Sequence, residues 1–319
     1  MEREGRVEVE KVGGRSTVTR CFSKYPLKFI IPRKVGPSKT DAVWVYNLTY
    51  GGGIVSGDSI SCEFNIGDGC TTVLTTQAST KGGVQDNDFG VPITSRGFII
   101  FIPLFVYKSV GFKCCEQVLE ARVGSNALLA VIPDPVTCFS TARYSQKQVF
   151  RVVSDSSLVI VDWITSGRHE SGEKWDFDLY KSINHIFMEN DEPLFLDAVH
   201  LERGNISSIA ERMQDYQVIA MVVLLGPKIK HIQNLVQENV KRIMSDQLHI
   251  PSTASGHQIK TNSDNRFAKP SFIASSSVFG PKGIGVVVRV AATTTESVYK
   301  FLQHQLAGME PLLGVSPYH

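Results

Sequence analysis

Residues 60–76 read Ile-Ser-Cys-Glu-Phe-Asn-Ile-Gly-Asp-Gly-Cys-Thr-Thr-Val-Leu-Thr-Thr. Apolar and polar residues alternate before Gly67-Asp-Gly69 and again after it, a pattern typical of two half-buried strands joined by a turn. The alternation recurs elsewhere in segments rich in Val, Ile, Thr and aromatic residues, which favour strands. These segments are 7–10, 16–20, 27–31, 117–123, 146–153 and 157–163. The chain is therefore predicted to be mainly β.

Two segments in the last third of the chain have helical spacing instead. Apolar residues there recur at intervals of three and four, which places them on one face of a helix. They are Ile229, Ile232, Val236, Val240 and Ile243 in the first segment, and Val298, Phe301, Leu302 and Leu306 in the second. We expect two helices in the C-terminal third.

The composition excludes several classes of protein. The chain has 319 residues, a net charge of +2 and 42% hydrophobic residues. These values are typical of a globular protein, and they lack the cationic excess of a dedicated nucleic-acid binder. The longest apolar run, 97–106, is about half the roughly 20 residues that a bilayer span needs. A charged N-terminus without an apolar run gives no secretory signal. We therefore expect a cytoplasmic protein without a membrane or nucleic-acid partner.

No common catalytic motif is present in the sequence. The chain contains no phosphate-binding loop of the Gly-x-x-x-x-Gly-Lys-Ser/Thr type, no His-Glu-x-x-His and no Gly-x-Ser-x-Gly. Its six cysteines include no Cys-x-x-Cys pair. These features argue against nucleotide hydrolysis by this chain and favour reduced, buried thiols.

A glycine run follows the aromatic segment near residue 50. Gly51, Gly52 and Gly53 are consecutive, and Asp58 follows five residues later. Glycine allows a close backbone approach to a partner or an ion, and it also occurs where strands bulge or pack tightly. The second interpretation is the more common one for glycines next to strands.

The segment 160–178 has the strongest concentration of chemically active side chains. A buried-looking strand there leads into a loop, and the segment contains Asp162, Arg168, His169, Glu170, Glu173 and Trp175. Carboxylates and an imidazole suit a divalent ion, so a metal-dependent hydrolase that uses 162–178 is one alternative. The other is an ion-paired turn, in which Arg168 neutralises Glu170 or Glu173 while the tryptophans lie in the core.

A shorter motif ends another apolar strand. Pro133-Asp134-Pro135 follows Ala130-Val-Ile132 and predicts a rigid turn. Asp134 is a candidate for lining an internal polar passage.

Residues 82–105 differ from their surroundings. The segment begins polar and ends in the aromatic and aliphatic run Phe98-Ile-Ile-Phe-Ile-Pro-Leu-Phe105. Its removal would join Lys81 directly to Val106 in one continuous strand-like segment.

Several of these stretches, in this order, resemble the urease accessory protein D family, called H in some bacteria, and most of all its plant members. The stretches are Leu48-Thr-Tyr-Gly-Gly-Gly-Ile-Val-Ser-Gly-Asp58, Thr75-Thr-Gln-Ala-Ser-Thr-Lys81, Pro133-Asp-Pro135, Asp162-Trp-Ile-Thr-Ser-Gly-Arg168, Gly172-Glu-Lys-Trp-Asp-Phe177 and Val288-Arg-Val290. The resemblance extends from about Val7 to Tyr318. It implies a single domain over 1–319 with an atypical insertion at 82–105.

The resemblance also implies a fold and a function. The expected fold is mainly β, with strands wound in a solenoid-like manner and two helices. The expected function is non-enzymatic: a scaffold that works with accessory protein F and the GTPase accessory protein G on apo-urease while nickel is inserted. Nickel would be in transit rather than permanently bound.

The same resemblance suggests residues with particular roles. The candidates for lining a nickel route are Asp58, Asp134, Asp162, Glu170 and Glu173. The candidates for motif residues that shape the fold are Gly51, Gly52, Gly53, Arg168 and Trp175.

The composition of 82–105 leads to a test at the level of the transcript. One hypothesis is that a retained intron encodes the segment, because its run of Phe, Ile and Leu is what a pyrimidine-rich intron end would encode. This hypothesis predicts spliced messages that lack these codons, which sequencing of mature transcripts would detect. If every mature message encodes the segment, the alternative of a genuine hairpin insertion is correct.

Overall fold

The computed structural model describes residues 3–32, 40–50, 53–76, 104–168, 171–204, 206–248 and 269–318. The strands are β1 (Gly5–Val12), β2 (Arg15–Ser23), β3 (Leu27–Ile30), β4 (Val43–Thr49), β5 (Gly53–Ile54), β6 (Ser59–Ile66), β7 (Thr71–Thr76), β8 (Leu104–Val106), β9 (Cys115–Val123), β10 (Leu128–Val131), β11 (Val136–Cys138), β12 (Arg143–Val152), β13 (Ser157–Thr165), β14 (Leu179–Met188), β15 (Pro193–Glu202), β16 (Val218–Leu225), β17 (Phe272–Phe279) and β18 (Gly285–Ala292). The helices are α1 (Ile209–Met213), α2 (Lys230–Leu248), α3 (Thr295–Leu306) and α4 (Glu310–Leu313).

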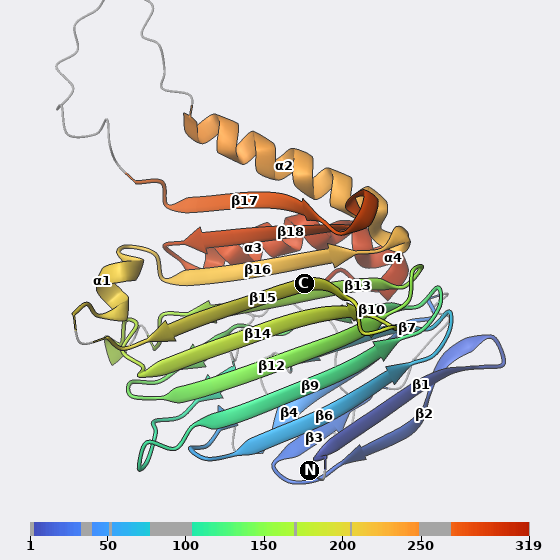
Figure 1. The fold of residues 1–319 in the computed structure, drawn as a ribbon, viewed down its shortest axis with the longest axis horizontal. Coiled ribbons are helices and arrows are strands. Elements are labelled where there is room, and N and C mark those ends of the chain that lie inside the picture. The colour runs from blue at the N-terminus through green and yellow to red at the C-terminus, as the bar shows by residue number, and fades with distance from the viewer. Residues whose placement is uncertain are drawn as a thin grey trace, which may run out of the picture.

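Within these ranges the strands form two sheets that lie face to face (Figure 1). The front sheet has seven strands in the order β15-β14-β12-β9-β6-β1-β2. The back sheet has eleven, with a main order of β17-β18-β16-β13-β10-β7-β4-β3 and with β11, β8 and β5 attached beside it.

The chain passes back and forth between the two sheets. From β6 to β14 it alternates between front and back strands, and each strand lies parallel to the one a full circuit earlier. Parallel neighbours need a crossover connection, which the opposite sheet supplies here. The prediction of a mainly β, solenoid-like fold is confirmed.

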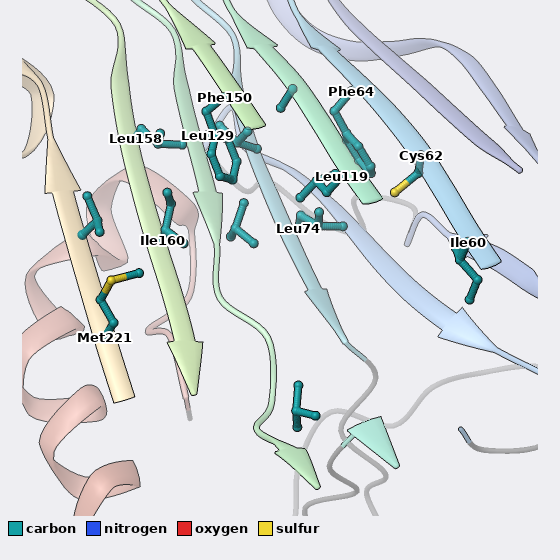
Figure 2. Packing of buried hydrophobic residues seen from close by; sticks show 14 of the residues in the cluster. Ile60, Cys62, Phe64, Leu74, Leu119, Leu129, Phe150, Leu158, Ile160 and Met221 are labelled. Atoms are coloured by element: carbon teal, nitrogen blue, oxygen red, sulfur yellow. The ribbon is translucent and has the colours of Figure 1, made fainter. Parts of the chain in front are cut away.

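Apolar side chains from both sheets fill the space between them. Figure 2 shows Phe64, Leu119 and Phe150 from the front sheet meeting Leu129 and Ile160 from the back sheet. All five belong to one buried cluster. Strand alternation accounts for this arrangement, because successive side chains point to opposite faces of a sheet.

Helices α2, α3 and α4 cover the outer face of the back sheet. The apolar sides of α2 and α3 pack on β16 and β18 in a second buried cluster, and α4 lies against β7. The two helices predicted for the C-terminal third are therefore confirmed as α2 and α3. Thr294 is the N-cap of helix α3, and the N–H of the preceding Thr293 bonds to the Ser271 carbonyl oxygen. Within the described ranges, no helix is long and apolar enough to cross a membrane.

Strand β8 begins at the first residue described after 103. Its Leu104 and Phe105, which the sequence analysis places in the insertion, pair with Val136 and Thr137 of β11. On the other side, Phe105 lies opposite Gly53 of β5. The remainder of the predicted insertion, 82–103, lies outside the described residues.

Gly53 is held tightly between neighbours. A Cβ at this position would lie 2.5 Å from the Phe105 carbonyl oxygen and 2.8 Å from a ring carbon of Tyr107. Real Cβ atoms do not approach a backbone oxygen so closely, so the glycine is required for packing between β5 and β8. This supports the packing interpretation of the glycine run at this residue.

We predict that Gly53→Ala lowers the free energy of unfolding by about 1–3 kcal/mol, because the added methyl group overpacks a rigid backbone contact. Urea denaturation would measure the change. Gly308→Ala is the control, because its Cβ would meet nothing closer than 3.5 Å and should cost no stability. Equal midpoints for the Gly53→Ala variant and the unmodified chain would contradict the role assigned to Gly53.

Candidate functional site

A small cavity with both apolar and polar side chains in its wall lies between the two sheets where β10 ends. Its volume is about 60 Å³, several times the roughly 10–15 Å³ that one water needs. Asp162 and Gln146 line its inner part, and Asp134, Thr76 and Pro133 line it beyond the end of β10. The structure thus brings together two of the carboxylates that the sequence singles out.

Strand alternation places the polar groups around Asp162. Asp162 on β13 points inward, as do its alternate neighbours Ile160 and Ile164. Across the gap, the inward positions of β12 and β14 carry Gln146, Ser182 and Asn184, all buried. The inner face of the front sheet is therefore polar at this point, between apolar layers on either side.

Several donors converge on the Asp162 carboxylate. Gln146 Nε2 donates to Oδ1 at 2.7 Å, and Asn184 Nδ2 donates to Oδ2 at 2.7 Å. The Ser182 hydroxyl donates to Oδ2, and the Tyr180 hydroxyl approaches Oδ1 at 3.4 Å. A buried carboxylate persists only when such partners replace water.

Burial dominates the electrostatics of this group. It raises the pKa of Asp162, although the hydrogen bonds from Ser182, Asn184 and Gln146 stabilise the charged form and offset part of the effect. Burial likewise raises the pKa of Tyr180 and of Tyr144, so both phenols stay protonated. Tyr144 donates to Gln117 Oε1 at 2.8 Å, which extends the network to β9.

The outer carboxylate, Asp134, has its own set of partners. Thr76 Oγ1 donates to Asp134 Oδ2 at 3.1 Å and accepts the Asp134 backbone N–H at 2.8 Å. The Tyr299 hydroxyl of α3 donates to Oδ1. Burial raises the pKa of Asp134, and the bonds from Tyr299 and Thr76 act in the opposite direction.

Aromatic residues cover this end of the cavity. Trp163 packs edge to face against Tyr299, with ring centres 4.8 Å apart. The Tyr318 hydroxyl and Trp163 Nε1 each donate to the Pro133 carbonyl oxygen at 2.9 Å. Residues far apart in sequence therefore pack together around Asp134 and Pro133, and Trp163 among them lines the cavity.

The other predicted carboxylates lie elsewhere. Asp58 is in a turn, where its Oδ2 accepts the Val55 N–H at 3.0 Å, and it does not line the cavity. Glu173 forms a two-pronged ion pair with Arg168, with distances of 3.1 and 2.6 Å, and this pair lowers the pKa of Glu173. Glu170, His169, Gly51 and Gly52 lie outside the described residues.

The loop around Arg168 matches the ion-paired alternative. The Arg168 guanidinium lies over the Phe139 ring, 3.9 Å from its centre. Trp175 is buried, and its Nε1 donates to the Tyr216 carbonyl oxygen at 2.8 Å. Arg168 and Trp175 therefore fix the shape of this turn.

Most of the partners of the two aspartates carry no clear signal in the sequence. Gln146 lies in a predicted strand, but nothing in its spacing indicates a role. Ser182 and Asn184 lie in β14, which we did not predict as a strand. The only trace in the sequence is that Tyr180 and Ile186 lie an even number of residues apart, with Ser182 and Asn184 at the inward positions between them. Within the described ranges, no three His, Cys, Asp or Glu side chains are grouped closely enough to hold a metal.

The raised pKa of Asp162 predicts a dependence of stability on pH. A raised folded-state pKa makes the contribution to stability complete below the ordinary carboxyl pKa, near 4, and lost as the pH rises through the folded value. The unmodified chain should therefore lose stability relative to Asp162→Asn as the pH rises from about 4, by about 1.4 kcal/mol per unit of pKa displacement. Urea denaturation over a series of pH values would measure this.

Asp155→Asn provides the control for this measurement. The Ser125 hydroxyl lowers the pKa of the Asp155 carboxyl, so its contribution has the opposite sign and disappears as the pH falls. Parallel pH curves for the unmodified chain and Asp162→Asn would contradict the prediction.

Known proteins resemble this chain over nearly its whole length. The family described as "UreD urease accessory protein" matches residues 2–82 and 105–318. Residues 83–104, within the predicted insertion, have no counterpart in that match.

Individual relatives agree with this match. "Urease accessory protein D" of Arabidopsis thaliana is 63% identical over 314 residues, covering 98% of this chain and 99% of the relative. The protein of the same name from Oryza sativa subsp. indica is 56% identical, covering 98% and 94%. "Urease accessory protein UreD" of Sorangium cellulosum is 32% identical, covering 98% and 82%. The plant-like character is confirmed, and the chain belongs to the UreD family of urease accessory proteins.

Proposed function

We propose that this chain is a scaffold in the maturation of urease, which holds apo-urease together with accessory proteins F and G while nickel is inserted. Membership of the UreD family supports the link to urease maturation. The family is one of accessory proteins, so the chain is not itself an enzyme. A separate GTPase, accessory protein G, would supply nucleotide hydrolysis, for which this chain has no phosphate-binding loop.

The proposal extends to a route for nickel through the cavity between the sheets. The observation that carries it is that Asp134 and Asp162, predicted separately from sequence, line one small cavity. Their carboxylates, with the amide oxygen of Asn47, offer oxygen ligands. Nickel is bound better by imidazole than by such oxygen atoms, so an ion here would be held weakly and passed on.

The energetic cost of burying carboxylates supports the same proposal. Leaving a charged group between two apolar sheets is unfavourable unless it is compensated, and a hydrophobic side chain at 162 would pack without that cost. A buried carboxylate with four donors at this point of the core therefore supports a role beyond packing. A divalent ion beside Asp162 would also favour its charged form.

The alternative of a metal-dependent hydrolase is not supported. Asp162 lies in the core, whereas Glu173 is neutralised by Arg168 on a surface turn. Among the described residues, the structure therefore separates Asp162 from Glu173, two carboxylates that such an active site would need to bring together.

We predict that the double variant Asp134→Asn/Asp162→Asn restores urease activity several-fold less well than the unmodified chain in cells that lack their own D protein. The amides keep the size of the carboxylates but remove the charges that attract the ion. The measurements are urease activity and the nickel content of purified urease. Association with accessory proteins F and G should be unchanged, which separates a defect in transfer from a misfolded scaffold.

Asp58→Asn is the matched control, because Asp58 lies outside the cavity and an amide oxygen can still accept the Val55 N–H. It should activate urease like the unmodified chain. Full activation and full nickel loading by the double variant would refute the route through the cavity. Failure of the unmodified chain to restore activity at all would refute the scaffold.

A further inference from the structure

Two neighbouring turns form a projection where β6 and β9 begin. Residues 55–57 belong to the turn before β6, and residues 108–113 lie between β8 and β9. The Ser56 hydroxyl accepts the Val110 N–H at 2.9 Å and so holds the two turns together. In Figure 1 the chain that leads into β9 projects from the lower left of the molecule. We call these two segments the knob.

The apolar side chains of the knob are strongly exposed. Phe112 is 84% exposed, Val110 is 72% exposed and Val55 is 51% exposed. Single apolar residues on a protein surface are ordinary, but three on two hydrogen-bonded turns form a patch. Side chains that stand so far out of the surface can be buried only by a partner that is hollowed to receive them.

The backbone holds Phe112 in a conformation that suits other residues better. Phe112 has a φ of 59° and Gly111 a φ of 62°, both in the left-handed region, which glycine adopts freely and a bulky residue only with strain. The turn is nevertheless fixed, because Ser109 Oγ donates to the Lys113 carbonyl oxygen at 2.9 Å. Neither the backbone nor the core requires phenylalanine at 112, and strain of this kind is typical of positions that contact a ligand.

Two lysines give the knob a positive border. Lys108 and Lys113 flank the exposed apolar residues, are exposed themselves, and have no ion-pair partner among the residues that the structure describes. The Asp58 carboxylate, which follows the first turn, accepts the Val55 N–H at 3.0 Å. A surface complementary to the knob would therefore carry carboxylates around an apolar centre.

A protein pocket fits the knob better than a lipid surface does. Stable attachment to a membrane needs a larger apolar area or a cluster of basic residues, whereas the knob offers one ring, two valines and two lysines. In a protein interface, one aromatic side chain that fills a pocket commonly supplies much of the affinity. A turn that hydrogen bonds already fix also loses little conformational freedom on binding.

We propose that Phe112 is an anchor that inserts into an apolar pocket, bordered by carboxylates, on another protein of urease maturation. Val110 and Val55 cover the mouth of this pocket, and Lys108 and Lys113 pair with its carboxylates. The inference rests on the proposed scaffold function, to which it adds one contact surface.

The test measures the affinity of the full chain for accessory protein F, accessory protein G and apo-urease, each in turn. Phe112→Gly should weaken binding to one of these proteins at least tenfold, because it removes the ring. Its melting temperature should equal or exceed that of the unmodified chain, because glycine adopts a φ of 59° without strain. Lys108→Glu/Lys113→Glu should weaken binding to the same protein.

Val12→Gly is the matched control. Val12 is 54% exposed, and it lies at the opposite end of the front sheet, because β1 runs parallel to β6 and Val9 is already level with the last residue of β6. This variant should bind each protein like the unmodified chain.

A fluorescence measurement identifies what covers the anchor. Phe112→Trp keeps an aromatic anchor, and the emission that it adds to that of the unmodified chain reports the surroundings of the new ring. In the chain alone this emission should be that of a water-exposed indole. It should shift to shorter wavelength when the partner protein binds, and vesicles of anionic lipid should cause no shift.

The outcomes separate the anchor from the scaffold. If the unmodified chain binds one of the three proteins and Phe112→Gly binds it equally well, the anchor is wrong while the scaffold function stands. If the added emission is that of a buried indole in the chain alone, or shifts only with vesicles, the assigned occupant is wrong. If the unmodified chain binds none of the three proteins, both proposals are overturned.

Discussion

The parallel register between successive circuits of the chain is the constraint on which the other features depend. Each front strand from β6 to β14 is fixed against the one before it, and the back strands from β7 to β13 follow the same rule. Because side chains alternate, a slip of one residue would turn a whole inner row outward. In β12 it would remove Gln146 from Asp162 and expose Phe150. The apolar core and the cavity are therefore positioned by the same backbone hydrogen bonds.

The space between the two sheets contains both apolar layers and a polar layer around Asp162. Phe64, Phe150 and Leu129 form an apolar layer, and the carboxylate of Asp162 lies farther along the same interior with four donors around it. Removing any one donor would leave a buried charge short of a partner, which is more costly than losing an ordinary surface hydrogen bond. Apolar neighbours hold the side chains of this network in place, and the network supplies the polar groups that line the cavity.

Much of the fold could be predicted from sequence because period-two alternation survives wherever one face of a strand is apolar. Strands β6, β7, β9, β12 and β13 were recognised in this way. Strand β14 was not, because its inward positions include Ser182 and Asn184, so its buried face does not look apolar. The residues that obscured the strand are the ones that surround Asp162. Asp134 and Asp162 could be singled out as carboxylates beside apolar strands, but their meeting in one cavity depends on circuits of the chain that local spacing does not reveal.

The wall beside Asp134 has a consequence for the order in which the molecule is completed. Strands β6 to β14 are contiguous in sequence and can pair as they leave the ribosome, since folding during synthesis proceeds from the N-terminus. Tyr299 and Tyr318, which hydrogen-bond to Asp134 and Pro133 at this end of the cavity, are made more than a hundred residues after Asp162. During translation the Asp134 carboxylate of a nascent chain therefore lacks its Tyr299 partner until helix α3 has docked.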